Sequence, residues 1–381
     1  MSRNDRGQLI ALFALLGAAA SALPASIPLF AEAMAVSVTE LLNAVPLMFA
    51  GLFLGVSVAP LLAQRLREQR LIQGFAVVLA TGILLVGLSQ TVTVFLVSAI
   101  VLGVGFGALE VLGTAAAKRL QSDTASRLTR LNAVFAISAF GTPALLALAS
   151  SIDQSAWVLY LLFAAALTFA FRFRSETGPV VREARAKKPT AALFVFMGAA
   201  ILFVGGETVI SGWSAVIASE LGGFDAGLAA LGGSSFWGLL AVGRILSVAL
   251  TPRILTPASA LPVWLLIATG SLLVAFISWD FVSAIGALMA FALATVAIGP
   301  CYALIIGMAL DTQEAIGAVA YTSSLVLAGS LGGFVLPAIL QLSPSVQNAA
   351  LTASLGFAGA LIFSVFGSFA SKANTKVRAT V

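Results

Sequence analysis

The sequence contains no histidine and only one cysteine, Cys301, among its 381 residues. Without histidine the chain has neither a histidine metal site nor a histidine proton relay, so any proton carrier in it must be a carboxylate. One cysteine cannot form an internal disulfide or a cysteine metal cluster. The sequence also lacks a Walker A pattern, and nothing in it indicates ATP-driven work. We expect neither an enzyme nor a bound cofactor or metal.

Charged residues are scarce as well, at 9% of the chain, whereas 60% of the residues are hydrophobic and the mean hydropathy is +1.08. Such a composition is typical of an all-α polytopic membrane protein and not of a soluble one. About 20 apolar residues are needed to cross the hydrocarbon core of a bilayer. On this criterion the sequence predicts twelve transmembrane helices, and we expect the first of them to remain uncleaved. They cover approximately residues 8–33, 40–63, 70–90, 92–117, 129–150, 155–172, 191–218, 225–250, 257–279, 281–309, 314–341 and 346–370.

The distribution of lysine and arginine predicts the orientation of these helices, because cytoplasmic loops of membrane proteins carry an excess of basic residues. All 20 basic residues fall at helix ends that share one side of the membrane, whereas the opposite loops carry acidic residues and no basic ones. We therefore expect both termini in the cytoplasm. The net charge of +5 is interpreted as a sign of topology and of contact with anionic lipid, not of nucleic-acid binding.

The longest polar stretch, FRFRSETGPVVREARAKKPT at residues 171–190, divides the predicted helices into two sets of six. Weak similarity between GAAASALPASIP from Gly17 and GAAILFVGGETV from Gly198 indicates that the two sets are related repeats. Internal repeats of this kind are common in membrane carriers. We predict an N-terminal six-helix bundle at residues 1–172, a cytoplasmic linker at 173–190 and a C-terminal six-helix bundle at 191–381.

Two acidic residues, Glu110 and Glu207, fall well inside predicted spans. A charged carboxylate in lipid costs a few kcal/mol, so each should face a cavity or a partner, or be protonated. Glu110 shares a helix face with Gly103 and Gly107, where small residues allow close helix contact. Glu207 begins a polar stripe with the serines that follow it at helical spacing. A purely structural hydrogen bond is the alternative for each residue, but the pattern favours two proton-coupling groups.

Several polar or aromatic residues inside the spans are candidates for holding a solute, because they offer hydrogen bonds or a ring face within the membrane. Tryptophans also anchor helices at membrane interfaces, which is the alternative for that residue type. Arg244 shares a helix face with Trp237 near a predicted cytoplasmic end, so we expect it to act as a gate or an inter-helix tie. The candidate solute-binding residues are Asn43, Asn132, Trp213, Trp237, Tyr321 and Ser324.

The stretch LPASIPLFAEAMAVS in the first span, the six-plus-six arrangement and a basic turn after the second span resemble the major facilitator superfamily over essentially the whole chain. That family has a motif after its second helix, a Gly, three residues and then Asp-Arg-x-Gly-Arg-Arg. Here Pro60, Gln64 and Arg67 occupy the Gly, Asp and second Gly positions, and only Arg65 is kept. The resemblance implies a gating role for Arg65, because the family motif locks the outward-facing state.

GGETVISGWSAVIASELGG followed by SSFWGLLAVGR, together with GFGALEVLGTAA, is similar to the branch of this family that contains the fucose permease. The glutamate in the fourth helix of that branch is implicated in sugar and proton handling, and Glu110 matches it. The asparagine found four residues later in the branch is Thr114 here. The first-helix aspartate of the branch has no mid-helix counterpart, because Glu32 lies near the outer end. The similarity therefore favours a sugar-like solute without fixing it.

Together, the residues and the resemblance predict a secondary active transporter of the bacterial inner membrane. It would move a small neutral or weakly polar solute by alternating access, coupled to protons as a symporter, and act as a lipid-embedded monomer. An efflux antiporter for hydrophobic compounds is the alternative, favoured by the apolar spans and a partial antiporter motif at Gly141 to Pro143. A sensor or lipid-handling scaffold is a third alternative, which the lack of a soluble signalling domain disfavours.

Overall fold

The structure, a computed structural model, describes residues 3–119, 124–152, 155–175, 191–254, 257–279, 281, 283–311 and 318–379. All regular secondary structure within these residues is helical. Eleven helices in this part of the chain are long and apolar enough to cross a membrane, by length and composition, and Ala156–Arg172 is a shorter apolar helix. The prediction of an all-α polytopic membrane protein with twelve spans is confirmed.

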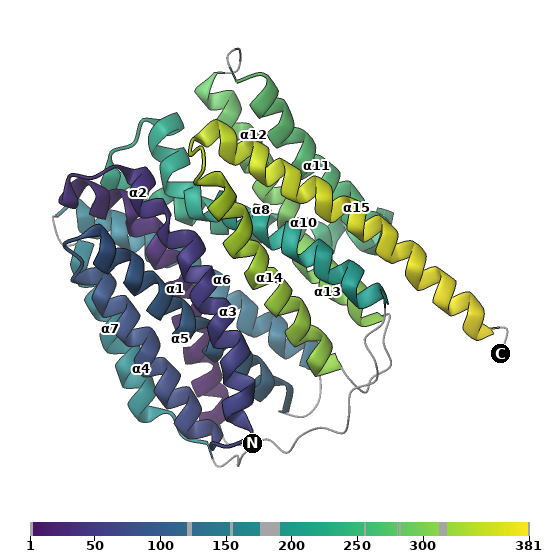
Figure 1. Ribbon diagram of the computed structural model, residues 1–381, viewed down its shortest axis with the longest axis horizontal. Helices are drawn as coiled ribbons and strands as arrows, with labels where there is room; N and C mark the ends of the chain where they lie inside the picture. The colour runs from purple at the N-terminus through teal and green to yellow at the C-terminus, as the bar shows by residue number, and fades with distance from the viewer. Residues whose placement is uncertain are drawn as a thin grey trace. The chain divides into compact units, whose positions relative to one another are not determined.

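Most predicted spans are single helices in the structure (Figure 1). A helix satisfies its backbone hydrogen bonds within one segment, as a lipid environment requires, so long apolar runs adopt this form. These helices are α1 (Arg3–Met34), α4 (Glu68–Gly87), α5 (Val92–Arg119), α6 (Thr124–Ser150), α7 (Ser155–Arg172), α8 (Ala191–Gly222), α11 (Pro257–Ile277), α14 (Ala318–Leu340) and α15 (Val346–Ala379).

Three predicted spans, 40–63, 225–250 and 281–309, are interrupted in the structure. In the first two a short helix precedes a long one, and the side chain of Ser37 or Asp225 caps the start of the short helix. These are the second spans of the two predicted halves, so the shared feature agrees with an internal repeat. The interrupted pairs are α2 (Val38–Leu42) with α3 (Ala44–Ala63), α9 (Ala226–Ala229) with α10 (Leu231–Ile254), and α12 (Ala284–Ile298) with α13 (Cys301–Asp311).

The chain divides into two compact units. The first unit comprises residues 1–182 and 212–237, and the second comprises residues 183–211 and 238–381. Helices α8 and α10 thus each contribute residues to both units. Most of the predicted linker, residues 176–190, lies outside the described residues. The division into six-helix bundles at residues 1–172 and 191–381 stays a prediction.

In the first unit, α5 packs against α3 and α4, and α1 packs against α6 (Figure 1). The contact between α3 and α5 is close because glycines remove side chains from it. A Cβ atom at Gly103 would overlap the carbonyl oxygen of Met48, and one at Gly107 would overlap that of Leu52. The small-residue face expected from the spacing of these glycines is therefore a helix contact.

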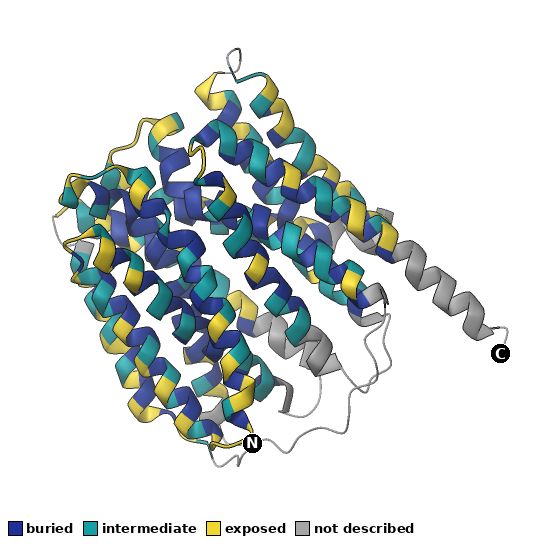
Figure 2. Cartoon of the chain, viewed as in Figure 1, coloured by how far each residue is buried: buried dark blue, intermediate teal, exposed yellow. Residues whose placement is uncertain are grey.

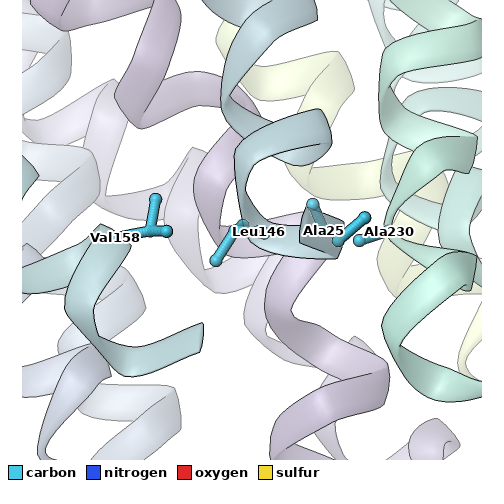
Figure 3. Packing of buried hydrophobic residues seen from close by; sticks show 5 residues of the cluster. Ala25, Leu146, Val158 and Ala230 are labelled. Atoms are coloured by element: carbon cyan, nitrogen blue, oxygen red, sulfur yellow. The ribbon is translucent and has the colours of Figure 1, made fainter. Parts of the chain in front are cut away.

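Buried and exposed residues alternate around the helices of the first unit (Figure 2). One buried cluster joins Ala25 of α1, Leu146 of α6, Val158 of α7 and Ala230. In the view of Figure 3, Leu146 lies between Val158 and Ala25. Large apolar side chains elsewhere on the helices stay exposed, such as Leu161 at 67%. Lipid can solvate such side chains, whereas in water they would promote association.

In the second unit, α11 packs against α12 and α15. Glycines again bring helices into close contact. A Cβ atom at Gly332 of α14 would overlap the carbonyl oxygen of Ile201 of α8. One at Gly243 of α10 would overlap the carbonyl oxygen of Val296 of α12. Through these contacts, the part of α8 that contains Glu207 and the part of α10 that contains Arg244 pack within the second unit.

Candidate functional site

Two oppositely charged residues of the second unit form the centre of the candidate site. Glu207 lies on α8 and Arg244 on α10, and both side chains are half-buried. Arg244 lies within Coulombic reach of Glu207, but no ion pair within 4.0 Å joins these two described side chains. An opposite charge offsets part of the cost of placing either group inside the membrane. The sequence had indicated that Glu207 faces a cavity or a partner, or is protonated, and its proton-coupling role stays a prediction.

Arg244 also contacts the interruption between α12 and α13. Its Nε atom donates a hydrogen bond to the carbonyl oxygen of Gly299, at 3.2 Å. Pro300 has no N–H group, so the helical ladder is interrupted there and begins again with the N–H of Leu304 donating to the oxygen of Pro300, at 3.1 Å. Polar backbone groups at such a break require partners inside a membrane. Arg244 therefore joins α10 to the broken tenth span.

Close backbone packing fixes the position of Arg244 relative to this break. Gly243 lies against the carbonyl oxygen of Val296, and a Cβ atom at Gly299 would lie 2.5 Å from the carbonyl oxygen of Leu240. Neither position has room for a side chain. The backbone of α10 thus meets the end of α12 directly, which places the Cα atom of Arg244 close to Gly299.

Aromatic and sulfur groups complete the surroundings of Glu207. The ring of Phe203, one helical turn before Glu207, stacks on the ring of Tyr302 of α13, with centroids 6.3 Å apart and planes at 19°. Cys301 is fully buried, donates from its Sγ atom to the carbonyl oxygen of Ala297 at 3.4 Å, and lies within electrostatic reach of Glu207. A carboxylate, a guanidinium, a thiol and a phenol therefore come from three helices of one unit.

The other predicted carboxylate, Glu110 of α5, belongs to the first unit and is half-buried. It has no hydrogen bond or ion pair with any residue whose side chain the structure describes. One turn before it, Phe106 meets Phe135 of α6 edge to face, with ring centroids 6.5 Å apart. The ring centroid of Phe135 lies 5.6 Å from that of Trp237 of α10, and the ring centroids of Trp237 and Phe236 are 5.3 Å apart. Glu110 therefore lies next to one end of an aromatic cluster made of Phe106, Phe135, Phe236 and Trp237.

Trp213 and Trp237, both predicted to bind solute, have different surroundings. Trp237 is half-buried within the aromatic cluster. Trp213 of α8 is 1% exposed, and its Nε1 donor has no hydrogen-bond partner among the residues that the structure describes. A buried indole N–H usually finds a partner. Because the side chain is buried, this unpaired donor is not exposed to solvent.

The remaining predicted residues are dispersed. Asn43 is not at the middle of a helix: it ends α2 and precedes α3, and its amide donates to the carbonyl oxygen of Glu40 at 3.1 Å. The polar Asn side chain favours such a junction over a helix interior, and this corrects its expected placement. Asn132 of α6 is exposed, and Ser324 of α14 is half-buried. The side chain of Tyr321 lies outside the described residues.

Arg65, the predicted gating residue of the degraded motif, follows the end of α3 and is exposed. Its backbone N–H donates to the carbonyl oxygen of Leu62, at 2.9 Å. Its gating role stays a prediction.

The break at Gly299 and Pro300 and the Coulombic interaction of Cys301 with Glu207 were not predicted. Span 281–309 was expected to be continuous because its residues are uniformly apolar. A Gly-Pro pair within that run is a recognised local signal for a turn and would have indicated the interruption. No local signal in the sequence indicates that Glu207 and Cys301 lie near each other, because they come from different helices.

Known transporters share this fold. A variant of the E. coli fucose:proton symporter superposes with a TM-score of 0.64 and 20% sequence identity, covering 95% of this chain and 98% of the symporter. A peptide transporter in complex with sulfate superposes with a TM-score of 0.74 and 13% identity, covering 95% of this chain and 93% of the transporter. A variant of the nucleoside transporter NupG superposes with a TM-score of 0.66 and 11% sequence identity, covering 97% of this chain and 99% of the transporter.

Neither a protein-family model nor a curated protein sequence matches the chain. The chain thus shares its fold with these solved transporters, in agreement with the resemblance seen in the sequence.

Proposed function

We propose that this protein is a secondary active transporter of the major facilitator superfamily that moves a small neutral or weakly polar solute by alternating access. Import coupled to protons is the favoured mode, and a sugar-like solute is the favoured cargo. The shared fold supports transport in general, since the transporters with this fold carry fucose with a proton, peptides or nucleosides. The choice of a polar solute rests on the residues of the two candidate sites.

The observation that carries the proposal is that Arg244, which is hydrogen-bonded to the break in the tenth span, lies within Coulombic reach of Glu207. Arginine keeps its charge under all physiological conditions. Whether Glu207 holds a proton therefore decides whether Arg244 is attracted to α8 or is held by the Gly299 carbonyl alone. A bound proton can thus change the relative stability of two helix arrangements, which coupled transport requires.

Glu110 and the aromatic cluster are the proposed solute contacts of the first unit. The carboxylate can accept hydrogen bonds from hydroxyl groups, and the rings of Trp237 and Phe135 offer apolar faces on which a sugar ring can stack. The unpaired N–H of Trp213 is a further donor. Asn43, Asn132, Tyr321 and Ser324 remain proposed contacts on the basis of the sequence.

Thermal-shift measurements on the purified protein test the class of solute. Ligand that binds only the folded state raises its stability by about 2.7 kcal/mol at 100 times the dissociation constant, so binding is detected without knowing the direction of transport. We expect a sugar or polyol to raise the melting temperature, and Glu110→Gln to abolish that rise. Screening would include nucleosides and lipophilic cations. A shift with lipophilic cations alone would contradict the sugar proposal.

One specific observation supports the alternative function, an efflux antiporter for hydrophobic compounds. Four aromatic side chains, Phe106, Phe135, Phe236 and Trp237, form a contiguous apolar cluster in which Phe135 and Trp237 are half-buried. Such a cluster also suits contact with a hydrophobic compound or a drug. Under this alternative the two carboxylates would bind the positive charge of an exported cation and not a proton that enters with a sugar.

Uptake into proteoliposomes tests the coupling. With an inward proton gradient and the solute found by thermal shift, we expect Glu207→Gln to reduce accumulation by about tenfold or more, because the coupling energy of a proton is lost. Counterflow, which needs no proton gradient, should be retained in this variant. Glu32→Gln makes the same change at an exposed position near the end of α1 and serves as the control. Accumulation by Glu207→Gln at the rate of the control would refute the coupling role.

A further inference from the structure

The three residues that follow α7 are bound by side chains from two other helices. The carbonyl oxygen of Phe173 accepts a hydrogen bond from Nε2 of Gln73, at 3.0 Å. The N–H of Arg174 donates to Oε1 of Gln8, at 3.1 Å, and the N–H of Ser175 donates to Oε1 of Gln69, at 3.3 Å. Gln8 belongs to α1, whereas Gln69 and Gln73 belong to α4. Consecutive backbone groups are thus held by three glutamine amides.

A buried carboxylate adds a fourth contact. Glu68, the first residue of α4, is only 7% exposed, although it lies at a helix end. Its Oε2 atom accepts a hydrogen bond from the hydroxyl of Ser175, at 2.7 Å. A negative charge in the first turn also interacts favourably with the helix dipole. A carboxylate is seldom this buried without a structural or functional reason.

Side chains of the bound segment itself also stabilise its conformation. The guanidinium of Arg174 donates from Nη1 to the carbonyl oxygens of Phe171 and Phe173, at 2.7 and 3.0 Å, and so satisfies groups at the end of α7. The side chain of Phe173 is 5% exposed and packs against Phe169, with ring centroids 5.6 Å apart. The backbone of residues 173–175 therefore has one defined path.

We propose that Gln8, Glu68, Gln69 and Gln73 form a linker clamp, a docking site that fixes the start of the segment joining the two predicted halves. The clamp binds mainly backbone groups, and it holds the ends of α1, α4 and α7 together. These four side chains act as positioning residues for the transport cycle, in which the first unit must move as one body. This role rests on the proposed transport function, whereas the docking itself does not.

Trypsin cleavage after Arg174 measures the docking directly in the purified protein in detergent. Proteolysis follows the population of the opened segment when opening is fast. Combining Gln69→Ala with Gln73→Ala removes two hydrogen bonds, so we expect cleavage after Arg174 to become about tenfold faster or more. Gln64→Ala changes an exposed glutamine at the end of α3 and should leave the rate unchanged. Equal rates in the double variant and in wild type would overturn the proposal.

Two matched variants separate the clamp from general destabilisation. Gln69 accepts its hydrogen bond and Gln73 donates its hydrogen bond. Gln69→Glu keeps an acceptor oxygen and should retain slow cleavage, whereas Gln73→Glu loses the donor and should accelerate it. The two substitutions change size and charge identically. The same cleavage rate in both variants would show that the proposed hydrogen bonds do not hold the segment.

Solute uptake tests the positioning role. For the double alanine variant, normalised to folded protein, we expect the maximal rate to fall at least about threefold with KM unchanged, because solute contacts are intact but the first unit moves less rigidly. An unchanged maximal rate, or a change in KM alone, would overturn the positioning role. If wild type itself transports nothing, the proposed function fails, and the cleavage experiment still decides whether the clamp exists.

Discussion

Replacing Arg244 with methionine should lower the stability of the folded protein by roughly 2 kcal/mol. Removing one partner of a fully buried charge pair costs about 3–5 kcal/mol, because the remaining charge is left uncompensated. The smaller value is expected here because both side chains of the pair are half-buried. The hydrogen bond from Arg244 to the Gly299 carbonyl is lost as well. The melting temperature of the purified protein in detergent measures this effect.

A second substitution tests whether Glu207 is the group left uncompensated. Adding Glu207→Gln to Arg244→Met removes the isolated carboxylate, so the double variant should be more stable than Arg244→Met alone. Accumulation driven by a proton gradient should be reduced in the double variant by about tenfold or more, as expected for Glu207→Gln alone. Arg65→Met, the same change at an exposed arginine, should alter the stability by about 0.5 kcal/mol or less. Strictly additive losses in the double variant would argue against the pair.

Replacing Gly103 with alanine should destabilise the first unit by about 1–3 kcal/mol. The added Cβ atom would overlap the carbonyl oxygen of Met48, which belongs to backbone and cannot rotate away. Helices α3 and α5 would have to separate, with loss of close packing along their contact. The expected result is a lower melting temperature and a lower yield of folded protein.

Gly74 provides the matched control for this prediction, because it lies inside α4 and a Cβ atom there would meet nothing within 4 Å. Alanine is favoured over glycine in a helix by about 1 kcal/mol, so Gly74→Ala should be neutral or stabilising. The two variants make the same chemical change. Gly103→Ala should lower the melting temperature, whereas Gly74→Ala should raise it or leave it unchanged. Equal destabilisation by both would mean that the α3 and α5 contact is not the cause.

The helical architecture could be predicted because the requirements of a membrane span concern consecutive residues of the chain. Each span must be apolar over about 20 residues, and this pattern is readable from the chain alone. The same holds for the contact face of Gly103 and Gly107, since helical spacing determines which residues share a face. Asn43 shows the limit of this approach. The apolar run around it continues without a visible gap, yet a capped short helix ends there.

The partners of the candidate residues could be predicted far less well. Arg244 and Glu207 were each recognised as unusual, but their attraction depends on how α8 and α10 pack, which no local pattern encodes. The linker clamp was missed for the same reason. Gln8 and Gln73 are ordinary polar residues near helix ends, and their role depends on the path that the chain takes 166 and 100 residues later, respectively.

The complete burial of Cys301 has a practical consequence. The natural chain presents no accessible thiol at the residues described, so a cysteine introduced on an exposed helix face can be labelled selectively without first removing the native one. Spectroscopic probes can then be attached in pairs to follow distances during a transport cycle. Since Cys301 is buried within the second unit, any labelling of the otherwise unmodified protein would itself report that this unit had opened around the thiol.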